Sequence, residues 1–251
     1  MDSEGFERAA KRVAQRQGRP DGIGALGEKT VHAVLKEYYG ESGQIEVPLC
    51  GFVADIVRDG SVIEIQTRGF DRLRPKLEAM LPQMKVTVVH PIARVKWIFW
   101  IDEENGLVSK KRRSPKVGTP FEAFRELYRI KRHLSHPNFA LKLVMLDLEE
   151  YRSLCDSGAD RKRGARRFDR IPLALGEEID IEGPEDWAKL VPGGLPGLFT
   201  SRDFGRAARV SLSGAQTALN VLKYVGAVKP MGKTGNSILY SAGGAKGATR
   251  P

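Results

Sequence analysis

The sequence has little cysteine and no long apolar run, and both shortages limit what the protein can be. Cys50 and Cys155 are far apart and lack C-x-x-C spacing, so neither a zinc site nor a disulfide framework is expected. The longest apolar runs, such as 95–101, are too short to span a bilayer. The charged N-terminal stretch does not have the pattern of a signal peptide. We therefore expect a cytoplasmic protein without a membrane partner.

The sequence also lacks a phosphate-binding loop and a metal-binding pattern of histidines. There is no G-x-x-x-x-G-K-[ST] phosphate loop, so ATP dependence is not indicated, and the four histidines have no ligand spacing with one another. Basic residues are in excess instead: 41 Lys and Arg against 31 Asp and Glu give a net charge of +10. Such a charge favours an anionic partner, and nucleic acid is the first candidate.

Apolar periodicity predicts an α/β fold with a mixed central sheet flanked by helices. The expected helices cover 4–17, which we expect to be loosely docked, 26–39, 71–81 and 121–134. The expected strands cover 45–57, 61–67, 85–90, 95–101 and 139–148.

Two acidic residues stand out in one expected hairpin. Asp59-Gly60 is a favoured two-residue type I′ turn, and the register it sets places Asp55 opposite Glu64. Directly opposed carboxylates destabilise a sheet unless a cation lies between them. Gln66 follows on the same face because side chains alternate along a strand. Two carboxylates with a third oxygen donor suit Mg²⁺.

Glu28 is a fourth candidate, because its helical spacing places it on the apolar stripe that contains Val31 and Leu35. Glu28 could instead simply be a favourable charge at a helix N-terminus. Asp55 and Glu64 could instead simply be polar residues on an exposed sheet face.

These residues resemble the motifs of the PD-(D/E)xK nuclease superfamily over about residues 24–92, most closely archaeal Holliday-junction resolvases and restriction-type endonucleases. The resemblance implies a restriction-endonuclease-like fold and hydrolysis of DNA phosphodiester bonds with Mg²⁺ or Mn²⁺. It implies that Asp55 and Glu64 hold the metal and that Glu28 assists the metal or its water. Gln66 then occupies the position of the family's lysine. Because glutamine carries no positive charge, we expect Lys76 or Arg74 of the next helix to replace it, or catalysis to be lost.

The C-terminal segment 198–241 resembles a winged helix-turn-helix, a common DNA-binding module. Thr200 or Ser201 is expected to cap one helix, Ser211 or Ser213 a second that ends near Gly226, and a β-ribbon to follow. Segment 185–190 is the expected first helix. The candidate DNA-binding residues of the second helix and the ribbon are Ser213, Gln216, Thr217, Asn220, Lys223 and Lys233. A basic loop adds Lys111, Arg112 and Arg113, whose alternative explanation is solvated loop charge.

The sequence thus predicts a nuclease-like domain over 1–157, a basic connection over 158–183 and a winged helix over 184–251 with a disordered tail. The expected function is a metal-dependent DNA endonuclease of restriction, repair or recombination type, and a homodimer is an open expectation. One alternative is a catalytically inactive regulatory or architectural DNA-binding protein. A weaker alternative makes both domains protein-interaction modules.

Overall fold

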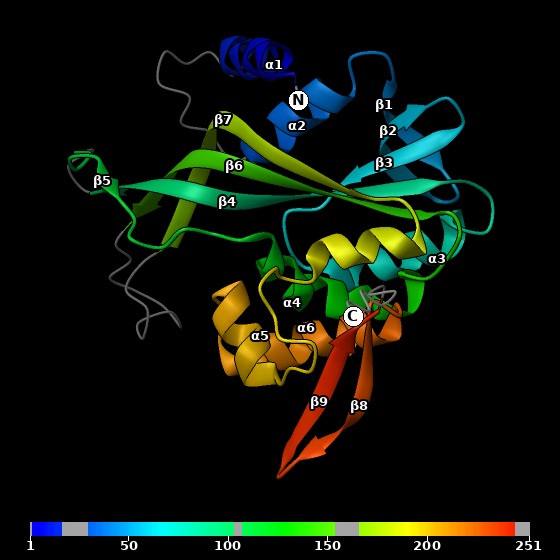
Figure 1. Cartoon of the computed structure of the whole chain (residues 1–251). Helices are drawn as coiled ribbons and strands as arrows, with labels where there is room; N and C mark the ends of the chain where they lie inside the picture. The colour runs from blue at the N-terminus through cyan, green and yellow to red at the C-terminus, as the bar shows by residue number, and fades with distance from the viewer. Residues whose placement is uncertain (1, 17–29, 103–106, 154–165, 244–251) are drawn as a thin grey trace.

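A mixed β-sheet forms the centre of the computed structural model, which describes residues 2–16, 30–102, 107–153 and 166–243. The strand order is β1-β2-β3-β4-β6-β7, and β5 pairs with β4 (Figure 1). The β3–β4 and β4–β6 pairs are parallel, and the other pairs are antiparallel. The strands are β1 (Gln44–Leu49), β2 (Phe52–Arg58), β3 (Ser61–Ile65), β4 (Val86–Ile101), β5 (Arg112–Arg113), β6 (Phe139–Ser153) and β7 (Arg166–Ile181). The expected α/β fold with a mixed sheet is confirmed.

Helices cover both faces of the sheet. On one face lie α1 (Ser3–Arg16) and α2 (Thr30–Tyr39), with Val31, Val34 and Leu35 packed on inward side chains of β2, β3 and β6. On the other face lie η1 (Phe70–Leu73), α3 (Arg74–Met80), η2 (Pro120–Ala123), α4 (Phe124–Leu127) and η3 (Tyr128–His133). None of the helices in the described residues is long and apolar enough to cross a membrane.

Three expectations about strands were wrong. The single strand expected over 45–57 is a hairpin, because Cys50 and Gly51 adopt positive φ angles of 50° and 78° and reverse the chain. The strands expected over 85–90 and 95–101 are one continuous strand, β4, with a bulge between Ala93 and Val95. Most of the expected connection 158–183 is strand β7.

Two expectations about helices also need correction. Helix α1 is firmly docked, since Phe6, Ala9 and Val13 are buried and Arg12 forms an ion pair of 2.9 Å with Glu37 of α2. The helix expected over 121–134 is mostly made of 3-10 turns.

The C-terminal unit consists of η4 (Pro184–Leu190), α5 (Ser201–Ala208), α6 (Leu212–Tyr224) and the hairpin β8 (Val228–Thr234) and β9 (Ser237–Ala242). The expected caps are confirmed, with Thr200 accepting a hydrogen bond from the amide of Asp203 and Ser211 one from the amide of Gly214. The buried side chains of this unit belong to the same hydrophobic cluster as those of α3, α4 and the sheet face that these two helices cover. The unit is therefore packed directly on the α/β part.

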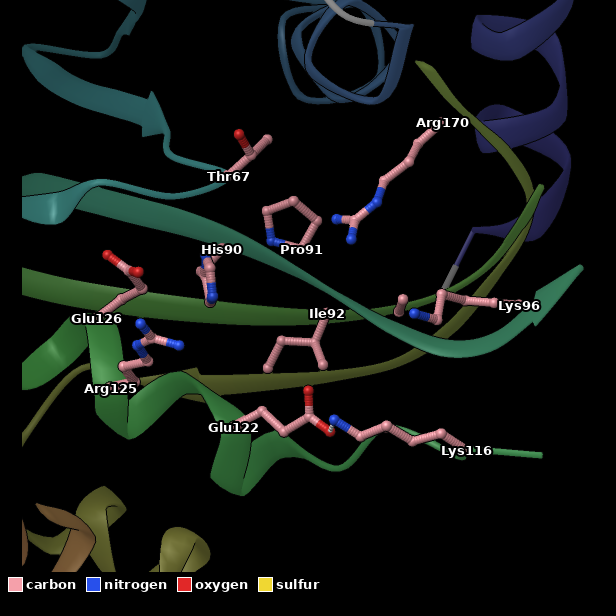
Figure 2. A pocket seen from close by; sticks show the side chains of 12 residues that line it. Thr67, His90, Pro91, Ile92, Lys96, Lys116, Glu122, Arg125, Glu126 and Arg170 are labelled. Atoms are coloured by element: carbon pink, nitrogen blue, oxygen red, sulfur yellow. Dashed lines mark ion pairs between the residues drawn. The ribbon is translucent and has the colours of Figure 1, made fainter. Parts of the chain in front are cut away.

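Strand β3 ends early, and among the described residues this leaves part of β4 without a neighbouring strand on that side. The amide of Gln66 still donates to the carbonyl of Val89, and the amide of Gly118 donates to that of Arg94 further along. A small cavity lies between these two points, along the stretch of β4 from His90 to Ala93 (Figure 2).

Candidate functional site

The β2–β3 hairpin has the register that the sequence predicted. Asp59 and Gly60 have φ angles of 50° and 71°, as a type I′ turn requires, and Arg58 pairs with Ser61. The ladder continues through the pair Ile56 and Ile63. Asp55 and Glu64 are the next two residues outward, so the turn brings their side chains together.

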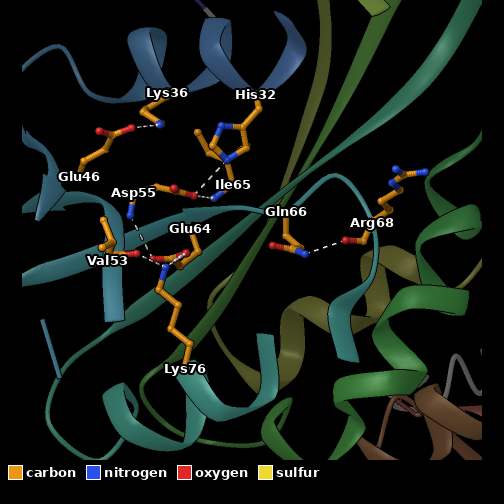
Figure 3. A network of polar contacts seen from close by, with 10 residues as sticks. All are labelled: His32, Lys36, Glu46, Val53, Asp55, Glu64, Ile65, Gln66, Arg68 and Lys76. Carbon is orange, nitrogen blue, oxygen red and sulfur yellow. Dashed lines mark hydrogen bonds and ion pairs between the residues drawn. The ribbon is translucent and has the colours of Figure 1, made fainter. Parts of the chain in front are cut away.

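Beyond Ile56 and Ile63 the carboxylates take part in the hydrogen bonding between the strands. The amide of Asp55 donates to Oε1 of Glu64 at 3.2 Å, and the amide of Ile65 donates to Oδ2 of Asp55 at 2.9 Å (Figure 3). Because strand amides point sideways within a sheet, both carboxylates lie in the gap between β2 and β3. Neither carboxylate lies simply on one sheet face, which refines the predicted arrangement.

Each carboxylate meets a basic side chain from a different helical layer. Nε2 of His32, on α2, lies 3.3 Å from Oδ2 of Asp55. From the opposite layer, Nζ of Lys76, on α3, lies 2.5 Å from Oε2 of Glu64 and also donates to the carbonyl of Val53. Figure 3 shows the order His32, Asp55, Glu64, Lys76 across the gap.

The two acids differ in how easily they ionise. Burial and the nearby charge of Asp55 raise the pKa of Glu64 to about 7, although Lys76 acts in the opposite direction. Burial also opposes ionisation of Asp55, but the hydrogen bond and charge of His32, with the amide of Ile65, outweigh it and lower the pKa of Asp55. A buried carboxylate beside a second one is an unfavourable arrangement that an added cation would relieve.

The remaining predicted site residues lie apart from this pair or outside the described part of the chain. The side-chain amide of Gln66 donates to the carbonyl of Arg68 at 2.6 Å, turned toward the following loop. Arg74 donates to the carbonyl of Arg129, so of the two candidate cations only Lys76 reaches the carboxylates. Glu28 lies outside the described residues.

The donor set fits a hard divalent cation in part. Asp55 and Glu64 offer carboxylate oxygens in a partly open gap, with exposed side-chain fractions of 18% and 4%. Within the described residues no group of three or more His, Cys, Asp and Glu side chains is arranged to hold a metal. A cation here would therefore need water, substrate oxygens or a residue outside those ranges to complete its shell.

Comparison with known proteins places this site within a recognised family. Residues 29–182 match a family described as a domain of unknown function (DUF8091). The chain belongs to the DUF8091 family. An uncharacterized protein of Treponema pallidum (strain Nichols) is 30% identical over 220 residues, which cover 87% of this chain and 86% of that protein. No solved structure matches.

The DUF8091 segment contains Asp55, Glu64, Lys76 and His32, and it ends where the C-terminal unit begins. The alignment with the Treponema protein is longer than the matched segment, so the similarity between these two proteins extends beyond the DUF8091 region.

The candidate DNA-binding residues of the C-terminal unit are not all equally accessible. Ser213, Gln216, Lys223 and Lys233 are exposed. Thr217 is half-buried and donates its hydroxyl proton to the carbonyl of Ser213. Asn220 is also half-buried, and its Oδ1 accepts a hydrogen bond of 2.9 Å from Lys131 of η3.

The basic segment of the DUF8091 region is not a free loop as expected. Arg112 and Arg113 form β5 and pair with Ile98 and Trp97, although both arginines are exposed. Lys111 lies 2.7 Å from a carboxylate oxygen of Glu149 and 5.0 Å from the ring centroid of Trp97. All three residues are exposed, but Lys111 is already engaged by Glu149 and Trp97.

From the sequence, His32 could approach the site, but a surface position was favoured because a histidine on a helix is more often a surface residue. Its spacing of four residues after Glu28 was the available signal. Sequence reasoning did not identify the cavity residues Lys96 and Arg125, which come from separate elements. Arg170 belonged to a basic segment for which phosphate contact was one explanation and solvated charge the other.

Proposed function

We propose that this protein is a divalent-metal-dependent DNA endonuclease of the PD-(D/E)xK type. The observation that carries the proposal is the meeting of Asp55 and Glu64 in the gap between β2 and β3, with Lys76 at hydrogen-bonding distance from Glu64. Lys76 comes from α3 and takes the place that the family pattern gives to a lysine at position 66. In this proposal Gln66 does not contact the metal.

Asp55, Glu64 and Lys76 have different proposed roles, which follow from their positions and charges. Asp55, with its lowered pKa, stays ionised at neutral pH and anchors the cation. Glu64 becomes fully ionised only when positive charge approaches, so its ionisation and metal binding favour one another. Lys76 supplies a fixed positive charge beside the place where the phosphate is attacked. The bound metal would activate water and stabilise the charge that develops on the phosphate.

The C-terminal unit is proposed to be a winged helix that binds DNA. Its order of helix, helix and hairpin supports this, as does the bridge that joins Phe199 to Tyr240 of β9. Between positions 193 and 251 there are eight Lys and Arg residues and one acid, Asp203. Asp203 is occupied in capping α5 at Thr200, so it offsets little of the positive charge.

A second candidate is a DNA-binding protein that does not cut, with regulatory or architectural use. The hydrogen bonds of Asp55 and Glu64 favour it, because each carboxylate already satisfies a strand amide and so has a structural use without metal. The orientation of the Gln66 amide toward Arg68 is equally compatible with this candidate.

Incubation with supercoiled, linear and branched DNA in Mg²⁺ or Mn²⁺ separates the two candidates. The proposal expects cleavage that is lost in Asp55→Asn and Lys76→Met, with a rate at least about 100-fold lower. Glu177→Gln is the matched control, because Glu177 is an exposed acid on β7 whose loss leaves the site intact. Binding of all three DNA forms without cleavage in either metal would leave the second candidate.

A further inference from the structure

The cavity beside β4 is produced by the local sequence. The segment that contains Gly118 runs close beside β4 at one end of the cavity. A Cβ atom on Gly118 would lie 2.0 Å from the carbonyl oxygen of Ala93, so this position needs glycine. Pro91 of β4 lies between the end of β3 and the Gly118 segment, and it has no amide proton to donate to another strand. This stretch of β4 therefore stays open, and the cavity of about 170 Å³ lies along it.

In the part of the chain that the structure describes, four Lys and Arg side chains line this cavity. They are Lys96 of β4, Lys116, Arg125 of α4 and Arg170 of β7. Figure 2 shows Arg170 on one side of the His90–Ile92 stretch, and Lys116 and Arg125 on the other. Positive groups from three elements and one connection therefore converge on the open edge of β4.

Of the two acids that line the cavity in the described residues, Glu122 pairs with one of the lining cations and Glu126 is engaged outside the cavity. Glu122 forms an ion pair of 2.9 Å with Lys116. Glu126 accepts a hydrogen bond of 3.0 Å from the amide of Phe70 and lies 3.6 Å from Nε of Arg129. These contacts hold the acids in place and reduce their ability to neutralise the other cations.

The cluster around Glu150, which includes the lining residues Lys96 and Arg170, also carries more positive than negative charge. Glu150 is fully buried and has Arg170 at 2.9 Å, Lys96 at 3.9 Å and Arg152 at 2.5 Å, so one carboxylate meets three cations. His90 adds no charge, because burial lowers its pKa. Nδ1 of His90 donates to the carbonyl of Gln66 at 2.7 Å.

Arg125 is the cation best placed to accept a ligand. It is exposed, it lines the cavity, and within residues 2–16, 30–102, 107–153 and 166–243 its guanidinium makes no ion pair or hydrogen bond. A guanidinium binds phosphate through two parallel hydrogen bonds. Thr67, three residues after Glu64 along the chain, adds a hydroxyl to the same cavity.

We infer that this cavity binds a backbone phosphate of a DNA strand that extends from the Asp55–Glu64 pair. The inference rests on the proposed function, since it identifies where the strand continues beyond the carboxylates. A phosphate fits better than a carboxylate ligand, because cations converge on the cavity from both sides of β4.

The test measures binding of a short fluorescein-labelled DNA strand by anisotropy in EDTA, so that no metal-dependent cleavage occurs. Arg125→Gln is expected to weaken binding roughly tenfold and to reduce the slope of log K against log salt concentration by about 0.7, the value for one lost contact to a single strand. Arg125→Lys should recover part of the affinity. Lys11→Gln, an exposed cation on α1, is the matched control and should change neither quantity.

A second arm uses inorganic phosphate to distinguish the source of the phosphate group. Stronger thermal stabilisation of the wild type than of Arg125→Gln by phosphate, together with the binding result, supports the inference. An unchanged salt slope in Arg125→Gln overturns it, and so does binding of free phosphate without binding of the DNA strand. Binding of the strand is measured in EDTA and needs no metal, so a failure of cleavage alone leaves this inference standing.

Discussion

At the scale of single residues, Glu64 is the unusual group of this protein. Its side chain is almost fully buried, and its neighbours are one carboxylate and one ammonium. Asp55 receives stabilisation from His32 and from the Ile65 amide, so the negative charge of the pair resides mainly on Asp55. This asymmetry follows from the two helical layers, which supply His32 on one side and Lys76 on the other.

The raised pKa of Glu64 predicts how stability depends on pH without metal. In the folded protein the pKa is about 7, while the unperturbed value is 4.5, so the folded state holds the extra proton between these limits. The free energy of unfolding should therefore fall as pH rises from about 4.5 to about 7, by on the order of 3 kcal/mol from this group. Glu64→Gln should remove this part of the dependence.

Urea denaturation in EDTA at several pH values measures the effect, with Glu177→Gln as the control for loss of an exposed acid. The difference between the wild type and Glu64→Gln isolates Glu64 from other titrating groups. Parallel pH profiles for these two proteins would contradict the assigned environment of Glu64.

At the scale of elements, the β2–β3 hairpin is the feature that holds the site together. Its turn contains Asp59 and Gly60 at positive φ, and the register that follows sets the position of both carboxylates. Gly60 has a φ of 71° with no atom near the place where a Cβ would lie, so a substitution there changes backbone strain without a steric clash.

Gly60→Ala should lower the free energy of unfolding by about 1 kcal/mol, because a residue with a Cβ adopts a left-handed conformation at that cost. Gly193→Ala is the matched control: that glycine also has open space around it, but it does not have a positive φ. Chemical denaturation of the three proteins measures the difference. Equal stability of the two variants would show that the turn tolerates a side chain.

The same strands show which turns and strand boundaries can be predicted from the sequence alone. The hairpin was predictable because Asp-Gly has a strong local preference for one turn type, and the register then follows by counting. The turn at Cys50-Gly51 was missed because apolar residues flank it without a polar loop. The sequence predicted two strands, 85–90 and 95–101, where the structure has one; Pro91 lies within it and is tolerated because none of the described strands pairs with this part of β4 on that side.

Lys76 shows which part of the candidate site could not be predicted from the sequence. The sequence offered Lys76 and Arg74 as equal candidates on one helix. The choice depends on how α3 is rotated against the sheet, which Leu77 and Met80 determine by burying themselves in the core. Such a rotation results from packing between distant segments, and local patterns do not specify it.

At the scale of the whole molecule, the C-terminal unit and the α/β part share one buried cluster. Phe204 of α5 is fully buried and packs edge-to-face on Phe121, with ring centroids 6.1 Å apart. Lys131 of η3 adds polar contacts, since it donates to Asn220 and lies 5.3 Å from the ring centroid of Tyr224 on α6. The sequence pattern identified the helices of this unit, but an amphipathic helix does not reveal which surface covers its apolar face.

Because the two parts share a core, they should unfold in a single cooperative transition. Phe204→Ala is expected to lower the free energy of unfolding by about 3–5 kcal/mol, and hydrogen exchange should accelerate in β6 as well as in α6. Leu212→Ala is the control, because Leu212 is 46% exposed and its loss should change stability by less than about 0.5 kcal/mol. Exchange that accelerates in α6 while β6 keeps its protection would instead identify two units that unfold independently.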